Sequence, residues 1–104
     1  MTEKNKYFVR IVKMEFQDDK TEEFLTNFRA VKDKIRAQKG NQLLELYQDR
    51  NQPNIFFTYS YWEKEEDLEN YKKTDLFKTV WAKTKVLFSA KPQAWSVDKR
   101  VVCS

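Results

Sequence analysis

Apolar and polar positions follow a strand-like pattern in four stretches of the chain. Residues 7–16 (YFVRIVKMEF) and 55–63 (IFFTYSYWE) are apolar on both parities, so we expect these strands to be covered on both faces. Residues 42–49 (QLLELYQD) predict another strand, and residues 94–102 alternate weakly and predict a last one. Pro and Asn within residues 50–54 (RNQPN) favour a turn, and five residues between two strands predict an antiparallel hairpin.

A first helix is predicted over about residues 20–38, because apolar residues recur there at steps of three and four. Asp18 and Asp19 precede it with the chemistry of a helix N-cap. Gly40 falls where a residue with left-handed backbone would end it. The apolar stripe comprises Phe24, Phe28, Val31 and Ile35, with Leu25 alongside.

Two further helices are predicted before the last strand. The first spans residues 64–73. The second starts with Thr74 or Asp75 as its cap, and Pro92 is predicted to end it. The inward faces comprise Leu68 and Tyr71 in the first, and Leu76, Phe77, Val80, Trp81, Thr84, Leu87 and Phe88 in the second.

The order β-α-β-β-α-α-β predicts a ferredoxin-like α+β fold, in which an antiparallel sheet carries its helices on one face. With 104 residues the chain suffices for one domain and not for two, and we expect its core over about residues 7–98. The helices cover one face, yet two strands are apolar on both. A second copy packed sheet to sheet would cover the other face, so we expect a homodimer.

Three residue counts exclude several kinds of chemistry. The chain has no histidine, one glycine and one cysteine. It therefore lacks the usual general base of serine and cysteine nucleophiles, a histidine ligand for zinc and a proximal histidine for haem. One glycine is too few for the loops that cradle nucleotide phosphates, and one cysteine makes neither a disulfide framework nor a thiolate cluster. We expect no cofactor.

Charge and hydropathy argue against nucleic acid and membrane partners. The 20 Lys and Arg and 16 Asp and Glu give a formal charge of +4, with both signs interspersed along the chain. Nucleic-acid binding favours clustered basic residues instead. Residues 1–6 are polar, and no apolar run approaches the roughly 18 residues of a membrane span. We expect a cytoplasmic protein.

Aromatic residues are the most informative candidates for a site. A cluster is predicted from Trp62, Tyr71, Phe77, Trp81, Phe88 and Trp95. Such large rings between a sheet and helices either fill the core or leave an apolar pocket for a flat, hydrophobic aromatic ligand. Tyr71 adds a phenol that can transfer a proton, or it is simply part of the core.

Arg10 lies on the strand parity that points into the core. There its guanidinium needs an anion or a wet pocket, unless the side chain snorkels to the edge of the strand. The acidic run of residues 63–67 is interpreted as partners of a helix N-terminus rather than as a cation site. Cys103 is interpreted as an incidental thiol close to the chain end.

Several segments together resemble the antibiotic biosynthesis monooxygenase family over about residues 7–98. They are the strand FVRIVKMEF, the helix TEEFLTNFRAVKDKI, the strand FFTYSYWE and the stretch YWEKEEDLENYKKTDLF, in which a Trp is followed by acidic residues, a Leu, an aromatic residue and a closing Phe. The resemblance implies a dimeric α+β barrel that oxygenates polycyclic phenols or quinols without metal, flavin or haem. The substrate's own enolate or phenolate then gives an electron to O₂, while the protein supplies a dry pocket and handles protons.

The chain departs from the family pattern at several positions. Val12, Tyr71 and Trp81 stand where a haem-degrading branch carries Asn, Trp and His, so haem degradation is disfavoured. Quinol-oxidising members often carry His near positions 71 and 76, where this chain has Tyr71 and Leu76. Tyr71 keeps a phenol for proton transfer, whereas Leu76 has no such group.

The main hypothesis is a cofactor-independent monooxygenase that oxidises a small aromatic or quinol-like substrate with O₂, in a pocket between the sheet and the second and third helices. Tyr71 would transfer protons, and Arg10 would stabilise the charge of a phenolate or peroxide. The predicted substrate-binding residues are Val12, Trp62, Phe77 and Trp81. The alternatives are a non-catalytic dimeric module that binds a small hydrophobic metabolite, and a structural dimer with a filled core.

Overall fold

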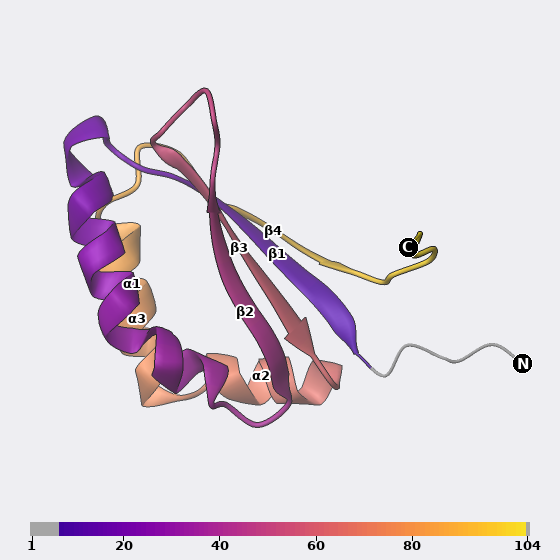
Figure 1. Ribbon diagram of the computed structural model, residues 1–104. Coiled ribbons are helices and arrows are strands. Elements are labelled where there is room, and N and C mark those ends of the chain that lie inside the picture. Colours follow the sequence, from indigo (N-terminus) through magenta and orange to yellow (C-terminus); the bar gives the residue numbers. More distant parts are fainter. Residues whose placement is uncertain (1–6, 104) are drawn as a thin grey trace, which may run out of the picture.

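Four strands pair into one antiparallel sheet in the computed structural model, which describes residues 7–103 (Figure 1). Across the sheet they are β2 (Asn41–Gln48), β3 (Ile55–Trp62), β1 (Phe8–Glu15) and β4 (Gln93–Val97). β1 and β3 are therefore central, and β2 and β4 form the edges. β2 and β3 pair antiparallel through the intervening turn, which confirms the predicted hairpin.

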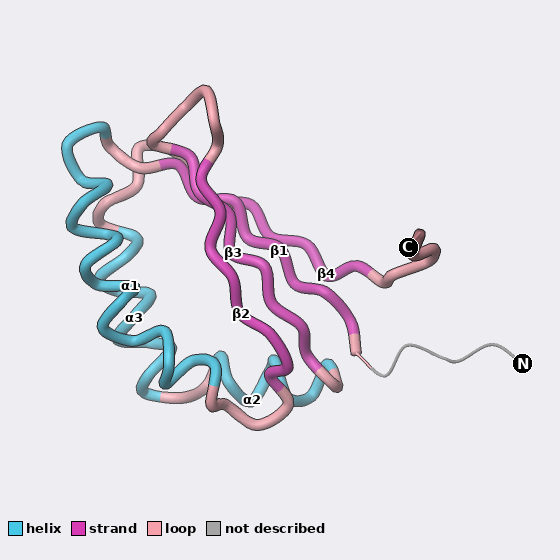
Figure 2. Tube along the Cα trace, viewed as in Figure 1, coloured by secondary structure: helices cyan, strands magenta, loops and turns pink. Residues whose placement is uncertain are grey.

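The helices of the described residues lie on one face of this sheet (Figure 2). They are a short 3₁₀ turn η1 (Asp18–Lys20), followed by α1 (Thr21–Arg36), α2 (Glu65–Lys72) and α3 (Asp75–Lys85). This order and layering confirm the predicted ferredoxin-like α+β fold. Within residues 7–103, no helix has both the length and the apolar character needed to cross a membrane.

The pairing of β1 with β3 decides which side chains face the helices. Successive residues of a strand point to opposite faces, and residues paired across two strands share a face. The pairs on the helix side are Phe8 with Trp62, Arg10 with Ser60, Val12 with Thr58, and Met14 with Phe56. The pairs on the open side include Val9 with Tyr61, Ile11 with Tyr59, and Lys13 with Phe57.

Two separate clusters of buried side chains make the core, one at each end of the sheet. One cluster comprises Phe8, Ile35, Trp62, Leu68 and Tyr71, and the other comprises Met14, Phe16, Phe24, Phe56 and Leu87. Between them the two central strands carry Arg10 opposite Ser60 and Val12 opposite Thr58. Because three of these four side chains are small, the middle of the helix side is less filled than its ends.

The chain leaves the third helix earlier than the sequence predicted. α3 ends at Lys85, well before Pro92. The backbone of residues 87–89 forms two hydrogen bonds of 2.9 Å with that of residues 15–17, at the end of β1. The prediction that Pro92 ends the helix was therefore wrong, because these tertiary hydrogen bonds draw the chain away first. The last strand, predicted over 94–102, is also shorter.

Gly40 lies in the turn between α1 and β2, where its φ angle is +85°. The predicted left-handed backbone is confirmed, although the cap residue of α1 is Ala37. A Cβ atom at position 40 would lie 2.2 Å from Oδ2 of Asp67, whose side chain is buried at the start of α2. The turn therefore requires glycine for both its backbone angle and its space.

We expect Gly40→Ala to lower the free energy of unfolding by about 1–3 kcal/mol, because the substitution strains the backbone and crowds Asp67. Urea denaturation followed by circular dichroism measures the change. Lys39→Ala, at the exposed preceding residue, is the matched control and should leave the midpoint almost unchanged. Equal midpoints for the two variants would contradict this account of the turn.

Candidate functional site

A cavity of about 440 Å³ occupies the incompletely filled space between the helices and the sheet. All four strands and all three α-helices contribute side chains to its wall within residues 7–103. Most of the lining is apolar, and the polar groups are few. This size and composition are typical of sites for small organic ligands.

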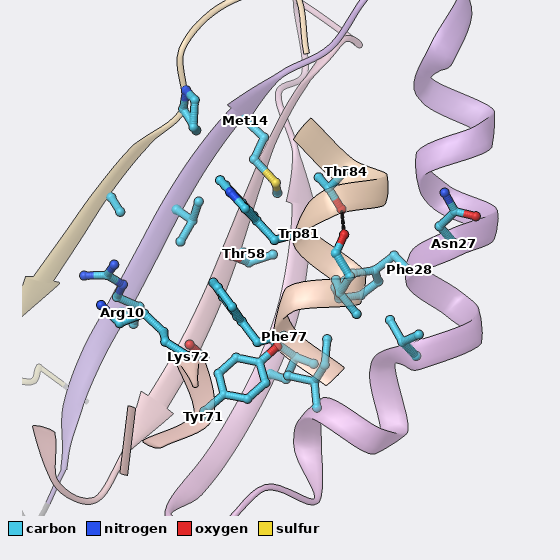
Figure 3. A pocket seen from close by; sticks show the side chains of 18 of the residues that line it. Arg10, Met14, Asn27, Phe28, Thr58, Tyr71, Lys72, Phe77, Trp81 and Thr84 are labelled. Carbon is cyan, nitrogen blue, oxygen red and sulfur yellow. Dashed lines mark hydrogen bonds between the residues drawn. The ribbon is translucent and has the colours of Figure 1, made fainter. Parts of the chain in front are cut away.

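The structure places all six residues that the sequence predicted for the site on the wall of this cavity. They are Arg10, Val12, Trp62, Tyr71, Phe77 and Trp81. The first two come from β1, the third from β3, the fourth from α2 and the last two from α3. Figure 3 shows the side chains from α2 and α3 facing the strands across the cavity. Segments far apart in the sequence therefore build one site.

Aromatic rings in contact form one wall of the cavity. The ring centroids lie 5.4 Å apart for Trp62 and Tyr71, 5.2 Å for Tyr71 and Phe77, and 6.1 Å for Phe77 and Trp81. The rings of Phe77 and Trp81 are nearly parallel (Figure 3), and the angle between their planes is 8°. Phe88 contacts Trp81 at 5.6 Å between ring centroids but does not itself line the cavity. Such a wall favours a planar ligand that stacks on it.

Tyr71 brings a phenol hydroxyl into this aromatic wall. Its side chain is buried, and burial raises the pKa of the phenol to about 12. The group is therefore neutral at physiological pH and can donate a hydrogen bond. No hydrogen bond among residues 7–103 involves this hydroxyl, and its oxygen points into the cavity (Figure 3). A bound ligand can accept a hydrogen bond from it.

A row of polar side chains crosses the sheet on the same side. Ser60 on β3, Arg10 on β1 and Ser96 on β4 are neighbours in the register. Nη1 of Arg10 donates to Oγ of Ser96 at 3.0 Å, and Nε1 of Trp62 donates to Oγ of Ser60 at 3.0 Å. No carboxylate of the described residues lies within ion-pair distance of Arg10. Most N–H groups of its guanidinium therefore remain for a ligand.

The charged side chains on the cavity wall are all positive. Arg10, Lys72 and Lys83 line it, and no Asp or Glu does so among the described residues. The chain as a whole carries 16 acidic residues. Their absence from this wall leaves a site that favours anions.

Sequence reasoning missed part of the wall. The pocket was predicted between the sheet and the second and third helices, but α1 also lines it with Phe24, Asn27 and Phe28. The apolar stripe of α1 was recognised, yet its spacing does not tell whether it fills the space beneath. Lys72 was also missed, because a lysine beside an inward-facing tyrosine has no distinctive pattern.

Trp95 does not join the aromatic wall, contrary to the prediction. It pairs with Ile11, so it points to the open face of the sheet, and it is 43% exposed. Its neighbours Ala94 and Ser96 pair with Val12 and Arg10 and therefore face the helices. The alternation of β4 thus turns small residues toward the cavity and the indole away from it.

Two other candidates lie away from the cavity. Glu65, Glu66 and Asp67 occupy the first turn of α2, as the interpretation of the acidic run requires. Residues 7–103 contain no group of three or more His, Cys, Asp or Glu side chains that could hold a metal. The thiol of Cys103 is exposed.

Solved structures with the same fold are known. A conserved protein from Methanosarcina mazei matches with a TM-score of 0.85 and 17% identity, over 90% of this chain and 93% of that one. Proteins from Nitrosomonas europaea and Caulobacter crescentus, each described as a "putative antibiotic biosynthesis monooxygenase", match with TM-scores of 0.86 and 0.84 and identities of 19% and 17%. The first covers 95% of both chains and the second 91% of both. At these identities the likeness shows the fold.

A sequence model of one family matches most of the chain. The model describes "antibiotic biosynthesis monooxygenase" and matches residues 7–83. All six predicted site residues lie within this range. A search of curated proteins finds no match to the chain.

Proposed function

The chain belongs to the antibiotic biosynthesis monooxygenase family, and from this premise we propose that it oxygenates a planar phenolic or quinol-like compound with O₂. The observation that carries the proposal is the composition of the cavity. The parallel rings of Phe77 and Trp81, the hydroxyl of Tyr71 and the guanidinium of Arg10 all line the same space. A ligand with a flat apolar body and oxygen at one edge matches these groups.

In the proposed complex the substrate lies flat between the rings of Phe77 and Trp81 and the central strands. Val12 forms part of the opposite wall from β1, and Trp62 closes the end beyond Tyr71. This arrangement excludes water from the ring of the substrate. A dry site protects the reactive anion and strengthens every electrostatic contact with it.

The electrons for the reaction come from the substrate. Loss of the phenol proton gives an electron-rich anion, which passes one electron to O₂ and then forms a C–O bond with the superoxide. The resulting peroxide takes up a proton, the O–O bond breaks, and the remaining C–H proton leaves. A CH₂ group of the keto tautomer and O₂ thus become a carbonyl and water, and the balance needs no external reductant.

Tyr71 and Arg10 have complementary roles in this scheme. Tyr71 is neutral and donates the proton to the peroxide, and the tyrosinate so formed is a strong base that takes the C–H proton in the last step. Arg10 stabilises the negative charge on the phenolate oxygen and on the peroxide, because its guanidinium has no carboxylate partner among the described residues.

Oxygen uptake by the purified protein tests the proposal. A panel of anthrones and reduced naphthoquinones is offered, and we expect at least one compound to consume O₂ faster with protein than in buffer. Val12→Trp, which fills the cavity from β1, should lower the rate of O₂ consumption to that in buffer while the circular dichroism spectrum stays unchanged. If a compound binds but consumes O₂ no faster than in buffer and is recovered intact, the protein is instead a module that binds a hydrophobic metabolite.

We also propose that the open face of the sheet packs against a second copy of the chain. Figure 1 shows this face without helices. Tyr47, Trp95 and Val97 are 48%, 43% and 41% exposed, and the rings of Tyr7 and Tyr61 stack at 4.7 Å. A broad aromatic patch of this kind favours burial in an interface.

Sedimentation velocity should give a homodimer, and Trp95→Glu should shift it toward the monomer, because the substitution would bury an unpaired carboxylate. Val86→Glu is the matched control, since Val86 is 66% exposed just after α3, and it should remain dimeric. A wild-type protein that sediments as a monomer would contradict the proposed interface.

A further inference from the structure

One region of the cavity wall gathers positive charge, and no Asp or Glu of the described residues lines the cavity beside it. Arg10 and Lys72 both line the cavity, and Figure 3 shows the side chain of Lys72 extending from the end of α2 toward Arg10 on β1. Two cations on the wall of one partly buried space repel, and a ligand anion that lies between them offsets this repulsion.

Arg10 is held in place but its charge is not neutralised. The hydrogen bond of 3.0 Å to Oγ of Ser96 fixes the guanidinium against β4. Next to it in the register, Ser60 is buried and accepts a hydrogen bond from the indole of Trp62. The hydroxyl of Ser60 therefore keeps its own proton to donate. Arg10 and Ser60 therefore both offer hydrogen-bond donors to a ligand.

Lys72 has a protein partner that a ligand can replace. Its Nζ lies 3.0 Å from Oε2 of Glu69, and the two side chains are 34% and 59% exposed. An ion pair at this helical spacing and exposure contributes little to stability. Breaking the ion pair with Glu69 so that Lys72 can bind a carboxylate of the ligand therefore costs little free energy. The same carboxylate also interacts with the charge of Arg10.

We infer that the substrate carries a permanent carboxylate, which Arg10 and Lys72 bind together, so that the substrate class is the hydroxyaromatic carboxylic acids. The inference rests on the proposed function for the ring and its hydroxyl, and it adds the acid group. Deprotonation of such a substrate gives a dianion, whose two charges match the two cations. Lys72 is then a residue that determines specificity rather than one that takes part in oxygenation.

Calorimetric titration under nitrogen tests the inference, with 1-hydroxy-2-naphthoate and 1-naphthol as probes that differ by the carboxylate. For the wild type we expect the acid to bind at least about tenfold more tightly, a difference of about 1.4 kcal/mol. Lys72→Met should remove most of this preference, and Lys72→Arg should restore it. Lys73→Met removes the same charge from the exposed next residue, which does not line the cavity, and should keep the preference.

Three outcomes would overturn the inference: equal affinity for the two probes, an equal loss in the Lys72→Met and Lys73→Met variants, or no saturable binding of either probe. The first removes the anion subsite, and the second reduces the effect to overall charge. Because nitrogen prevents turnover, this test does not depend on oxygenation. A carboxylate preference without oxygen uptake would support the ligand class and contradict the monooxygenase proposal. Oxygen uptake without a carboxylate preference would support the monooxygenase proposal and contradict the ligand class.

Discussion

Replacing Tyr71 with phenylalanine is expected to lower kcat by about 10²–10⁴-fold, the usual contribution of a positioned acid or base, while ligand affinity stays nearly unchanged. The substitution removes one oxygen atom and keeps the ring contacts with Trp62 and Phe77 at 5.4 Å and 5.2 Å. Because burial raises the pKa of Tyr71 to about 12, the wild-type hydroxyl stays protonated at any pH below that value. Its ionisation should therefore not limit activity at neutral pH.

Oxygen uptake gives kcat for this variant, and calorimetry gives its ligand affinity. Tyr47→Phe, in which an exposed phenol on the open face is removed, is the matched control and should keep wild-type turnover. Unchanged turnover in Tyr71→Phe would show that protons pass through another group. A parallel loss of ligand affinity would instead show that the hydroxyl contributes to binding of the substrate before any reaction occurs.

Phe16→Ala is expected to have the largest effect on stability, a loss of about 3–5 kcal/mol in the free energy of unfolding. Phe16 is fully buried, with its ring centroid 4.3 Å from that of Phe24, 5.3 Å from Phe88 and 5.8 Å from Phe56. Truncation leaves a void where α1, β3 and the segment after α3 meet. Little in this cluster can move to fill it.

Urea denaturation at one fixed protein concentration measures this loss. Phe28→Ala is the matched control, because Phe28 is partly buried beside the cavity, and its truncation should lower stability less. If Phe16→Ala does not fold, Phe16→Leu should show a smaller loss in the same direction. Equal losses at positions 16 and 28 would contradict the view that the end of the sheet is filled and its middle is not.

The strand parities could be predicted from the sequence because two-residue alternation is a local property. The alternation in residues 7–16 placed Arg10 and Val12 on the core side, and the structure confirms this through their pairing with Ser60 and Thr58. The end of α3 could not be predicted in the same way. It depends on hydrogen bonds between residues 87–89 and 15–17, which are far apart in the chain.

The site was predictable in its residue types and less so in its boundaries. Large aromatic side chains in residues 62–81 indicated a pocket, and the six predicted residues do line one cavity. Trp95 was misplaced because a weakly alternating strand leaves its parity ambiguous until the register with β1 is known. The space itself arises where Val12, Thr58 and Ser60 meet across two strands, and a single sequence does not show which small residues will face each other.

Incubation with anthrone under ¹⁸O₂, followed by mass spectrometry, tests the central claim most directly. The proposed reaction predicts one molecule of O₂ consumed for each anthraquinone formed, one ¹⁸O atom in the new carbonyl and the other in water. It also predicts that Tyr71→Phe slows this labelling while anthrone still binds. Anthrone that binds but is converted no faster than in buffer, or an unlabelled product formed together with hydrogen peroxide, would contradict the account.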